Sequence, residues 1–476
     1  MQVTRLDDKY DVVVIGSGFG SLFMVETYLK RHPKARIAII ERGTYRDHAW
    51  QVDAGRNSDI DVSDLHGTGA GEKPWNYTVG FGGGLNCWWA QTPRFHPTDF
   101  QTHTLYGKGI DWPMSYDDLE ESYCLAEERM NIAGDPAMAA ILPRSRDFSQ
   151  PAHRLTTIDR MMMAKQADMH VPMSTARASQ PTDDRGQCCS SAKCNLCPVD
   201  AKFSIHNGFA SLLEAEGIDI ILDAEVRYID HAAGVAKGVQ YLHHGQLRSV
   251  SGDLVVLGAN GVHSPAILLR SGIDGEWVGR GIHEQHSIQY EAYLDGLDNF
   301  DGGTVTTSLN FALYDGGFRK NHGGALLYFE NRWSFGLRPE PGKWRMTLPI
   351  WVSIEDLPSI ENHVMLDASE NPVVSHKEMS AYALGGAKMV DDRLEKLLAP
   401  LPVEKLHYRG IADTASHIQG SVRMGKSRKD SVVDGGLLHH DIRNLMIVGS
   451  GVIPTSSCAN PSLTTAALSI FATNRL

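Results

Sequence analysis

The sequence predicts an α/β fold in two parts, one built on a parallel sheet covered by helices and one built on an antiparallel sheet. An apolar stretch at residues 11–15 is followed directly by a glycine-rich turn and a segment of helical composition. Residues 287–400 alternate apolar and polar positions, which is typical of antiparallel strands. The chain has 476 residues, which is too long for one simple core.

The first element expected is a strand–helix–strand unit near the N-terminus. Asp11–Ile15 and Arg36–Ile40 are apolar strands, and Leu22–Arg31 between them has helical composition. The turn reads GSGFGS, in which glycines permit close approach of a pyrophosphate to the helix N-terminus. An acid that ends the second strand binds ribose hydroxyls and disfavours a 2′-phosphate, so FAD or NAD is favoured over NADP. The expected cofactor contacts are Gly16, Gly18, Gly20, Ser21, Glu41 and Arg42.

A second glycine-rich segment follows a polar stretch. Residues 46–80 have few periodic apolar positions and predict a long loop or lid over the cofactor. The sequence GFGGGLNCWW at 80–89 suits a backbone pressed against a flat ring or a pyrophosphate, and a simple flexible glycine loop is the alternative. The contacts expected here are Gly83, Gly84, Asn86 and Cys87.

Four of the seven cysteines fall within ten residues. Soft ligands at this density suit an iron–sulfur cluster or a zinc ion, and a structural thiol cluster or disulfide is the third alternative. The candidate ligands are Cys188, Cys189, Cys194 and Cys197.

The middle of the chain predicts a meander and then the antiparallel sheet. Short strands are expected at 219–222, 224–229 and 238–242, followed by an apolar strand ending near Gly258 and a helix at 266–271. Strands of one substrate-side sheet are expected at 287–293, 326–330, 346–353 and 362–367. Aromatic residues that could line a carbohydrate site are Trp333, Phe335, Trp344 and Trp351.

The last sixty residues carry the candidate catalytic pair. His417 can take a proton from a hydroxyl group, and the carboxamide of Asn460 can hold that hydroxyl in place. An apolar strand at 445–448 and a helix at 463–472 frame Asn460. Taken alone, the two residues are more readily explained as a core histidine and a turn residue, and the rest of the chain changes that balance.

Together, GSGFGS, GGGLNCWW, HIQGSVRMG and NLMIVGSGVIPTSSCANPSLTTAA resemble the glucose–methanol–choline (GMC) oxidoreductases. The resemblance is greatest to the sugar- and polyol-oxidising branch, which includes pyranose oxidases and bacterial FAD sugar dehydrogenases. It implies an FAD-binding Rossmann-type domain with a second, antiparallel-sheet substrate domain, and a flavin that accepts hydride from an alcohol carbon. It places His417 and Asn460 at the flavin as the catalytic pair. Further expected cofactor contacts are Val226 near the adenine, Gly449, Pro461 and Thr464.

The resemblance also bears on Cys87 and on the cysteine-rich loop. Cys87 falls where pyranose oxidases carry a covalent flavin bond through histidine, so a thioether to the flavin is one expectation. The cysteine-rich loop resembles one that holds a three-iron (3Fe-4S) cluster in bacterial FAD sugar dehydrogenases, where the last spacing is one residue longer.

The resemblance implies a division of the chain into five segments. Residues 1–100, 186–286 and 406–476 would form the FAD-binding domain. Residues 101–185 would be a helical and loop segment shared with the substrate domain, and residues 287–405 the substrate-binding sheet.

Composition bears on partners and compartment. The net charge is −12 and no basic run tracks a phosphate backbone, which argues against nucleic-acid binding. No apolar segment has transmembrane length, and acids stand where a signal peptide needs an apolar core. We therefore expect a cytoplasmic protein, with export to the periplasm by a partner subunit as the alternative.

The expected function is FAD-dependent oxidation of an alcohol group of a sugar, polyol or aminosugar. Oxygen, a quinone or a cytochrome subunit would then accept the electrons. The alternatives are a catalytically inactive flavin-binding subunit for assembly or sensing, and an NAD-linked enzyme that uses the same fingerprint.

Overall fold

The computed structural model describes residues 2–3, 5–69, 73–331 and 343–476. Its largest sheet has the order β7-β2-β1-β10-β9-β8, and β18 also pairs with β10. The strands β7, β2, β1, β10 and β18 are parallel, and β9 and β8 continue from β10 as an antiparallel meander. The strands are β1 (Lys9–Ile15), β2 (Ile37–Ile40), β7 (Ile218–Ile221), β8 (Ala224–Ala232), β9 (Val235–His243), β10 (Gln246–Leu257) and β18 (Leu445–Ile447).

The second large sheet is antiparallel throughout, as the alternating pattern predicts. Its order is β17-β11-β14-β13-β12-β6. The strands are β6 (His170–Pro172), β11 (His286–Leu294), β12 (Thr306–Asn310), β13 (Ala325–Glu330), β14 (Thr347–Ile354) and β17 (Val403–Ile411). The α/β fold with a second antiparallel sheet is thus confirmed, whereas the five-segment division stays a prediction.

For two of the predicted strands, the expected pairing partner is wrong. The strand expected at 362–367, β15 (His363–Leu366), does not join the large antiparallel sheet but pairs with β16 (Pro372–Ser375). The strand β7, expected beside β8, pairs instead with β2 at the other edge of the parallel sheet. An alternating pattern identifies the buried face of a strand and does not identify its neighbour.

The helices agree with the expected segments more closely. They are α1 (Phe19–Arg31), α2 (His48–Ala54), α3 (Gly84–Cys87), α4 (Thr102–Tyr106), α5 (Tyr116–Met130), α6 (Thr157–Gln166), α7 (Ile205–Gly208), α8 (Asn260–Arg270), α9 (Ala381–Leu397) and α10 (Ser462–Thr473). Helix α2 lies in the stretch expected to be a loop. It begins where the Asp47 side chain accepts from Trp50 N and ends at Gly55, whose φ is 65°. The short β3 (Gly67–Thr68) follows it and pairs with β16.

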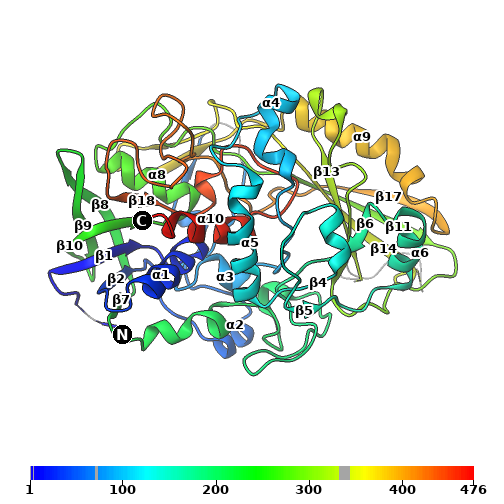
Figure 1. Cartoon of the computed structure of the whole chain (residues 1–476), viewed down its shortest axis with the longest axis horizontal. Helices are drawn as coiled ribbons and strands as arrows, with labels where there is room; N and C mark the ends of the chain where they lie inside the picture. Colours follow the sequence, from blue (N-terminus) through cyan, green and yellow to red (C-terminus); the bar gives the residue numbers. More distant parts are fainter. Residues whose placement is uncertain (1, 4, 70–72, 332–342) are drawn as a thin grey trace.

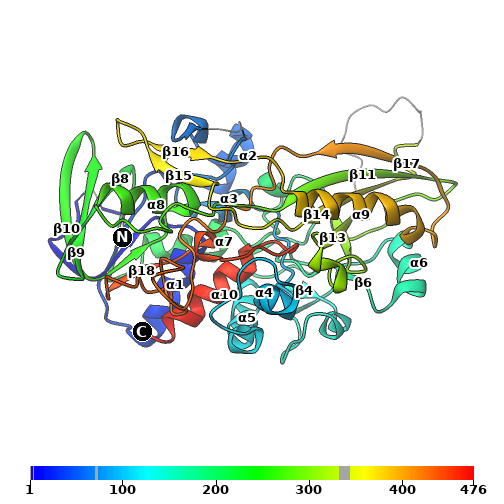
Figure 2. The ribbon, with the colours of Figure 1, turned by 90° about the horizontal axis from the view of Figure 1, so that it is seen from above.

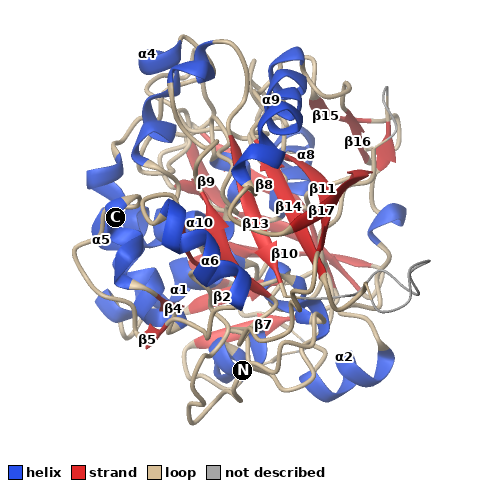
Figure 3. Cartoon of the chain, turned by 90° about the vertical axis from the view of Figure 1, so that its right-hand side faces the viewer, coloured by secondary structure: helices blue, strands red, loops and turns tan. Residues whose placement is uncertain are grey.

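The antiparallel sheet separates two cores. On β13, Ala325, Leu327 and Phe329 pack into a core with residues of α6 and α9. Leu326 and Tyr328 belong to the larger core on the opposite face. Figure 3 shows α9 and α6 next to the strands of this sheet. The alternation of side chains along β13 therefore turns Tyr328 toward the rest of the molecule.

The two large sheets lie at opposite ends of the long axis (Figure 1). Seen from above, β9 and β10 lie at one end and β11, β14 and β17 at the other (Figure 2). The C-terminal α10 packs against α1 and α5. Within the described residues, no helix is both long and apolar enough to cross a membrane.

Candidate active site

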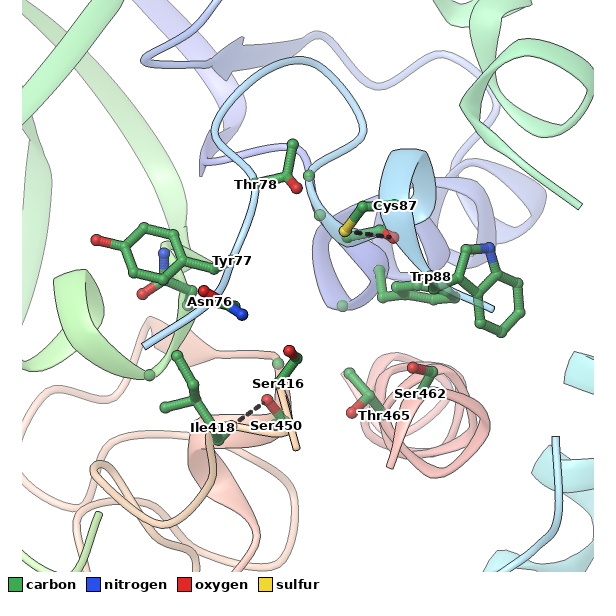
Figure 4. A pocket seen from close by; sticks show the side chains of 18 of the residues that line it. Asn76, Tyr77, Thr78, Cys87, Trp88, Ser416, Ile418, Ser450, Ser462 and Thr465 are labelled. Atoms are coloured by element: carbon green, nitrogen blue, oxygen red, sulfur yellow. Dashed lines mark hydrogen bonds between the residues drawn. The ribbon is translucent and has the colours of Figure 1, made fainter. Parts of the chain in front are cut away.

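A cavity of about 730 Å³ is lined by residues of both sheets. Ile15 and Ile40 come from the parallel sheet, and Tyr328 and Trp351 come from the antiparallel one. Figure 4 shows part of the cavity wall. Asn76, Tyr77 and Thr78 lie on one continuous loop segment, Cys87 and Trp88 lie on another segment, and Ser462 and Thr465 lie on α10. Segments from both ends of the chain thus line one cavity.

The glycine-rich turn forms one end of this cavity. A Cβ added at Gly16, whose φ is +81°, would lie 2.7 Å from Gly258 O, and one at Gly20 would lie 2.6 Å from Gly449 N. A Cβ at Gly18 would meet nothing within 4 Å, because Gly18 faces the cavity. Two glycines therefore permit packing of the turn on β10 and β18, and the third leaves room for a ligand.

Glu41 lines the cavity at the end of β2, as predicted for a ribose-binding acid. Its carboxylate accepts from Ser17 N at 3.0 Å, from Ser17 Oγ at 2.7 Å and from Gly43 N at 3.0 Å. A carboxylate offers about four acceptor positions, so one remains for a ligand hydroxyl. The open face at Gly18, the α1 N-terminus and this acid fit a dinucleotide such as FAD.

Gly83, Gly84 and Cys87 also line the cavity. Gly83 has a φ of +48°, and a Cβ there would lie 3.2 Å from Gly18 Cα, so the two glycine-rich turns lie against each other. Asn86 is not among the lining residues. Its Nδ2 donates to Phe81 O at 3.0 Å and to Gly83 O at 3.1 Å, so it holds the turn from behind.

Of the remaining residues expected to contact the cofactor, some line the cavity and others lie behind its wall. Arg42, Val226, Gly449 and Pro461 line the cavity, whereas Ser21 and Thr464 do not. Ser21 lies behind the turn, where its Oγ would be 2.1 Å from a Cβ at Gly258. Thr464 Oγ1 is 2.8 Å from Tyr123 Oη, away from the cavity, and the neighbouring Thr465 lines it instead.

The structure brings His417 and Asn460 together. Asn460 Nδ2 lies 3.2 Å from His417 Nε2, and both residues line the cavity. Desolvation deep in the molecule lowers the pKa of His417 to about 4, although Glu284 opposes the shift. One side of the ring still faces the cavity, so the side chain is only half-buried by solvent accessibility. A neutral imidazole in this place is ready to accept a proton.

Three residues that sequence reasoning missed hold this pair. Tyr328 Oη donates to Asn460 Oδ1 at 2.9 Å, and Gln285 Oε1 lies 3.1 Å from His417 Nδ1. Glu284 accepts from His417 N at 3.0 Å. Glu284 and Gln285 lie in the segment directly before β11. No local pattern links it to a histidine more than 130 positions away.

Glu284 also fixes the chain before His417. It is almost fully buried, accepts from Ala415 N at 3.0 Å, and forms an ion pair with Lys73. Lys73 Nζ also donates to Asp413 O at 2.9 Å and lies over the Trp75 ring. The segment expected to be a lid is therefore attached to the segment that carries the candidate base.

Of the aromatic residues expected at a carbohydrate site, Trp351 lines the cavity. Glu330 and Ser353 line it as well, so this wall combines an aromatic ring with hydrogen-bonding groups. Trp344 is exposed and packs edge-on against Phe300, outside the cavity. Trp333 and Phe335 lie outside the described residues.

The cysteine-rich loop packs beside the cavity. Its helical turn at Cys194–Leu196 contacts α3, and Cys194 Sγ is 3.5 Å from Arg177 Nη1. The buried Lys202 donates to Asn86 O at 2.7 Å and to Trp88 O at 3.1 Å. Among the described residues, no group of three or more His, Cys, Asp or Glu side chains is arranged to hold a metal ion. The structure therefore gives no support to a cluster on Cys188, Cys189, Cys194 and Cys197, whose exposures range from buried to exposed.

Comparison with known proteins adds to this geometry. Models of the GMC oxidoreductase family match residues 153–287 and 364–469. The chain is 26% identical to the fructose dehydrogenase large subunit of Gluconobacter japonicus, covering 98% of this chain and 97% of that protein. It is 26% identical to the 6'''-hydroxyparomomycin C oxidase of Streptomyces lividus, covering 96% and 89%. In fold it is similar to a pyridoxine 4-oxidase of Mesorbium loti, with a TM-score of 0.66, 17% identity and coverage of 98% and 99%.

Proposed function

Because this chain belongs to the GMC oxidoreductase family and is an FAD-dependent alcohol oxidoreductase, we propose that it oxidises a sugar, polyol or aminosugar with His417 as the base. The observation that carries the proposal is the pairing of His417 Nε2 with Asn460 Nδ2 at 3.2 Å on the wall of the FAD-sized cavity. An inactive flavin-binding subunit would not need a neutral, desolvated imidazole in that place.

The substrate class is supported by the relatives and by the cavity wall. Fructose and hydroxyparomomycin, named in the two relatives, are both polyhydroxylated, and the second also carries amino groups. Trp351 offers an aromatic face, and Glu330 and Ser353 offer hydrogen-bond acceptors on the same wall. The net charge of −12 favours a neutral or cationic substrate over an anionic one.

In the proposed mechanism the substrate hydroxyl contacts both His417 and Asn460 from the side of the cavity. Nε2 of His417 accepts the hydroxyl proton, while the Asn460 carboxamide orients the oxygen. Residues at the glycine-rich turn, Glu41 and the N-terminus of α10 would hold FAD. When bound, FAD supplies the acceptor for the carbinol hydrogen as hydride.

The test is flavin reduction by alcohol in the His417→Ala variant. We expect the anaerobic reduction rate to fall by about 10²-fold or more, because general-base catalysis contributes at least that much. The FAD content should not change, because the ring only borders the cavity. His439→Ala is the matched control, because burial also lowers the pKa of His439 to about 4 but His439 does not line the cavity. Normal reduction by the His417 variant would remove the proposal.

The route by which electrons leave is a second question. The cysteine-rich loop contacts α3 on one side, and Asn195 of that loop lines the main cavity. Cys188 and Cys189 line a separate polar hollow of about 560 Å³. An outward path through a 3Fe-4S cluster to a cytochrome partner would use this loop; its support is the number of cysteines there and a relative that is named as a large subunit, and not the arrangement of the side chains. Oxygen or a quinone acting directly on the flavin is the alternative.

An anaerobic absorption spectrum with iron counted per flavin separates these routes. Several irons per flavin, lost in Cys194→Ser, would support the cluster and a partner. Negligible iron, with fast reoxidation by oxygen, would assign the cysteines a structural role.

A further inference from the structure

Gln285 joins the two candidate catalytic segments. Its side chain is almost fully buried, and its Nε2 donates to Ser457 O at 2.7 Å and to Ala459 O at 2.8 Å. Both carbonyl groups belong to the loop that leads into Asn460. The Oε1 atom lies 3.1 Å from His417 Nδ1. One amide thus contacts the Asn460 loop and the His417 ring.

The orientation of the Gln285 amide is fixed by these partners. An amide nitrogen carries two hydrogens, and the two backbone carbonyl oxygens can only accept. A flipped amide would place its oxygen against two carbonyl oxygens and leave both of them without a donor. The Nε2 atom must therefore face Ser457 and Ala459, and Oε1 must face His417.

The hydrogen bonds at the Asn460 end of this network run in the same direction as those at Gln285. Tyr328 Oη donates to Asn460 Oδ1 at 2.9 Å and lies 3.3 Å from Cys458 O. With the Tyr328 hydroxyl donating to Asn460 Oδ1, Asn460 Nδ2 faces His417 Nε2, which agrees with the direction that Gln285 sets. The bonds then run in one direction, from Tyr328 through Asn460 and His417 to Gln285 and the loop carbonyl groups.

This direction determines which nitrogen of neutral His417 carries the proton. Oε1 of Gln285 can only accept, so Nδ1 must donate and hold the hydrogen. Nε2 is then left with its lone pair, and it faces Asn460 on the cavity wall. With the opposite tautomer, Nε2–H would meet the amide donor of Asn460, and Nδ1 would meet an oxygen that cannot donate.

We propose that Gln285 is a positioning residue that holds neutral His417 as the Nδ1–H tautomer, so that the lone pair of Nε2 is directed to the substrate hydroxyl. This inference rests on the proposed role of His417 as the base. It gives Gln285 an effect on proton transfer separate from its effect on the stability of the Asn460 loop.

The direct test is nitrogen NMR of FAD-loaded protein labelled with 15N-histidine. The His417 signals are assigned by their absence in His417→Gln. At pH near 7.5 we expect the Nδ1 signal of a protonated nitrogen and the Nε2 signal of an unprotonated one. A protonated Nε2 with a bare Nδ1 would overturn the inference.

A pair of variants separates the tautomer from the loop. Gln285→Glu and Gln285→Met both lose the amide donor to Ser457 O and Ala459 O, but only the glutamate keeps an acceptor at Nδ1. We expect Gln285→Met to convert His417 partly to the Nε2–H form and to slow flavin reduction about tenfold, with a smaller change in KM. Gln285→Glu should keep the Nδ1–H form.

The pH profile gives a second readout. A carboxylate at position 285 stabilises the imidazolium, so the acidic limb of flavin reduction should move to higher pH than in the wild type. Of the other titratable groups nearby, Glu284 is paired with Lys73, and Tyr328 and Glu330 share the cavity wall. Equal losses in both variants, with no change of tautomer, would leave Gln285 a purely structural role and overturn the proposal.

Two controls complete the design. Gln150→Met removes another buried glutamine that binds backbone N–H groups, those of Ser179 and Gln180, far from His417 in the hydrogen-bond network. It should not alter the His417 signals. If the flavin of the His417→Ala variant is reduced by alcohol at the normal rate, the proposed function fails. The NMR measurement of the His417 tautomer tests the role of Gln285 independently of that result.

Discussion

At the scale of single residues, we expect replacement of glycine by alanine to have different effects on stability and on FAD binding at Gly18 and at Gly20. A Cβ at Gly20 would lie 2.6 Å from Gly449 N, so Gly20→Ala must push β18 away from α1. We expect it to lower the midpoint of thermal unfolding with or without FAD. A Cβ at Gly18 meets no protein atom within 4 Å, so Gly18→Ala should leave the FAD-free protein unchanged and weaken FAD binding.

Thermal unfolding and FAD titration of both variants check this pair. A Gly18→Ala protein that binds FAD as tightly as the wild type would show that the dinucleotide lies elsewhere. Gly317→Ala is a useful third variant, because a Cβ there would also meet nothing within 4 Å while the residue lies outside the cavity.

The sequence revealed those residues whose role is local. Gly16, Gly18 and Glu41 were found because a strand, a tight turn and a helix follow one another within thirty positions. His417 and Asn460 were found through a resemblance, and only the structure brings them to 3.2 Å. Gln285 and Tyr328 were missed because their partners are more than 130 positions away. Nothing next to a glutamine in sequence indicates which atom it will contact.

At the scale of elements, the ion pair between Lys73 and Glu284 joins the segment before β11 to the segment after α2. The Lys73 side chain is 12% exposed and that of Glu284 is 1% exposed. Removing one partner of a buried pair leaves an uncompensated charge, so Lys73→Met should lower the free energy of unfolding by about 3 kcal/mol. Chemical denaturation measures this loss.

A surface pair provides the matched comparison. Lys377 and Glu361 are 65% and 58% exposed, and an exposed pair contributes at most about 1 kcal/mol. Lys377→Met should therefore be nearly neutral. A Lys73→Met protein as stable as Lys377→Met would mean that the carboxylate of Glu284 is sufficiently satisfied by the backbone N–H groups of Ala415 and His417.

The elements themselves were largely predictable, and their neighbours were not. Strand β18 follows from an apolar run that ends in glycines, and helix α10 follows from a second apolar run at 463–472. Helix α2 was missed because its seven residues are too few to show a helical period, and its caps at Asp47 and Gly55 determine it. Strand β15 was assigned to the wrong sheet, because the pairing of β15 with β16 depends on a short turn between them.

At the scale of the whole molecule, several buried histidines predict acid sensitivity. Burial lowers the pKa to about 4 for His153, His206, His376, His417 and His439. The unfolded chain has histidine pKa values near 6.5, so between pH 6.5 and about 4 it binds more protons than the folded protein. The free energy of unfolding should therefore fall as the pH drops through this window.

Thermal unfolding from pH 8 to pH 4 measures this dependence. His439→Asn should make it shallower, because the Asn oxygen can replace Nδ1 as acceptor for Asp441 N and Ile442 N without taking up a proton. His103→Asn changes an exposed side chain and should leave the slope as it is. If the unfolding midpoint of the wild type did not change over this pH range, that result would contradict the burial of these imidazole rings.

The glycine-rich turn packs against Gly449 through Gly20, and α1 packs against α10, so this end of the cavity depends on elements near residue 450 and beyond. During synthesis on the ribosome, the first strand–helix–strand unit emerges long before β18 and α10 exist. Its glycine-rich turn then has no neighbour on one side, and the flavin end of the cavity has no wall. We therefore expect cofactor loading to follow the synthesis of α10, so a cell short of FAD would accumulate apoprotein that already contains β18 and α10 rather than stalled nascent chains.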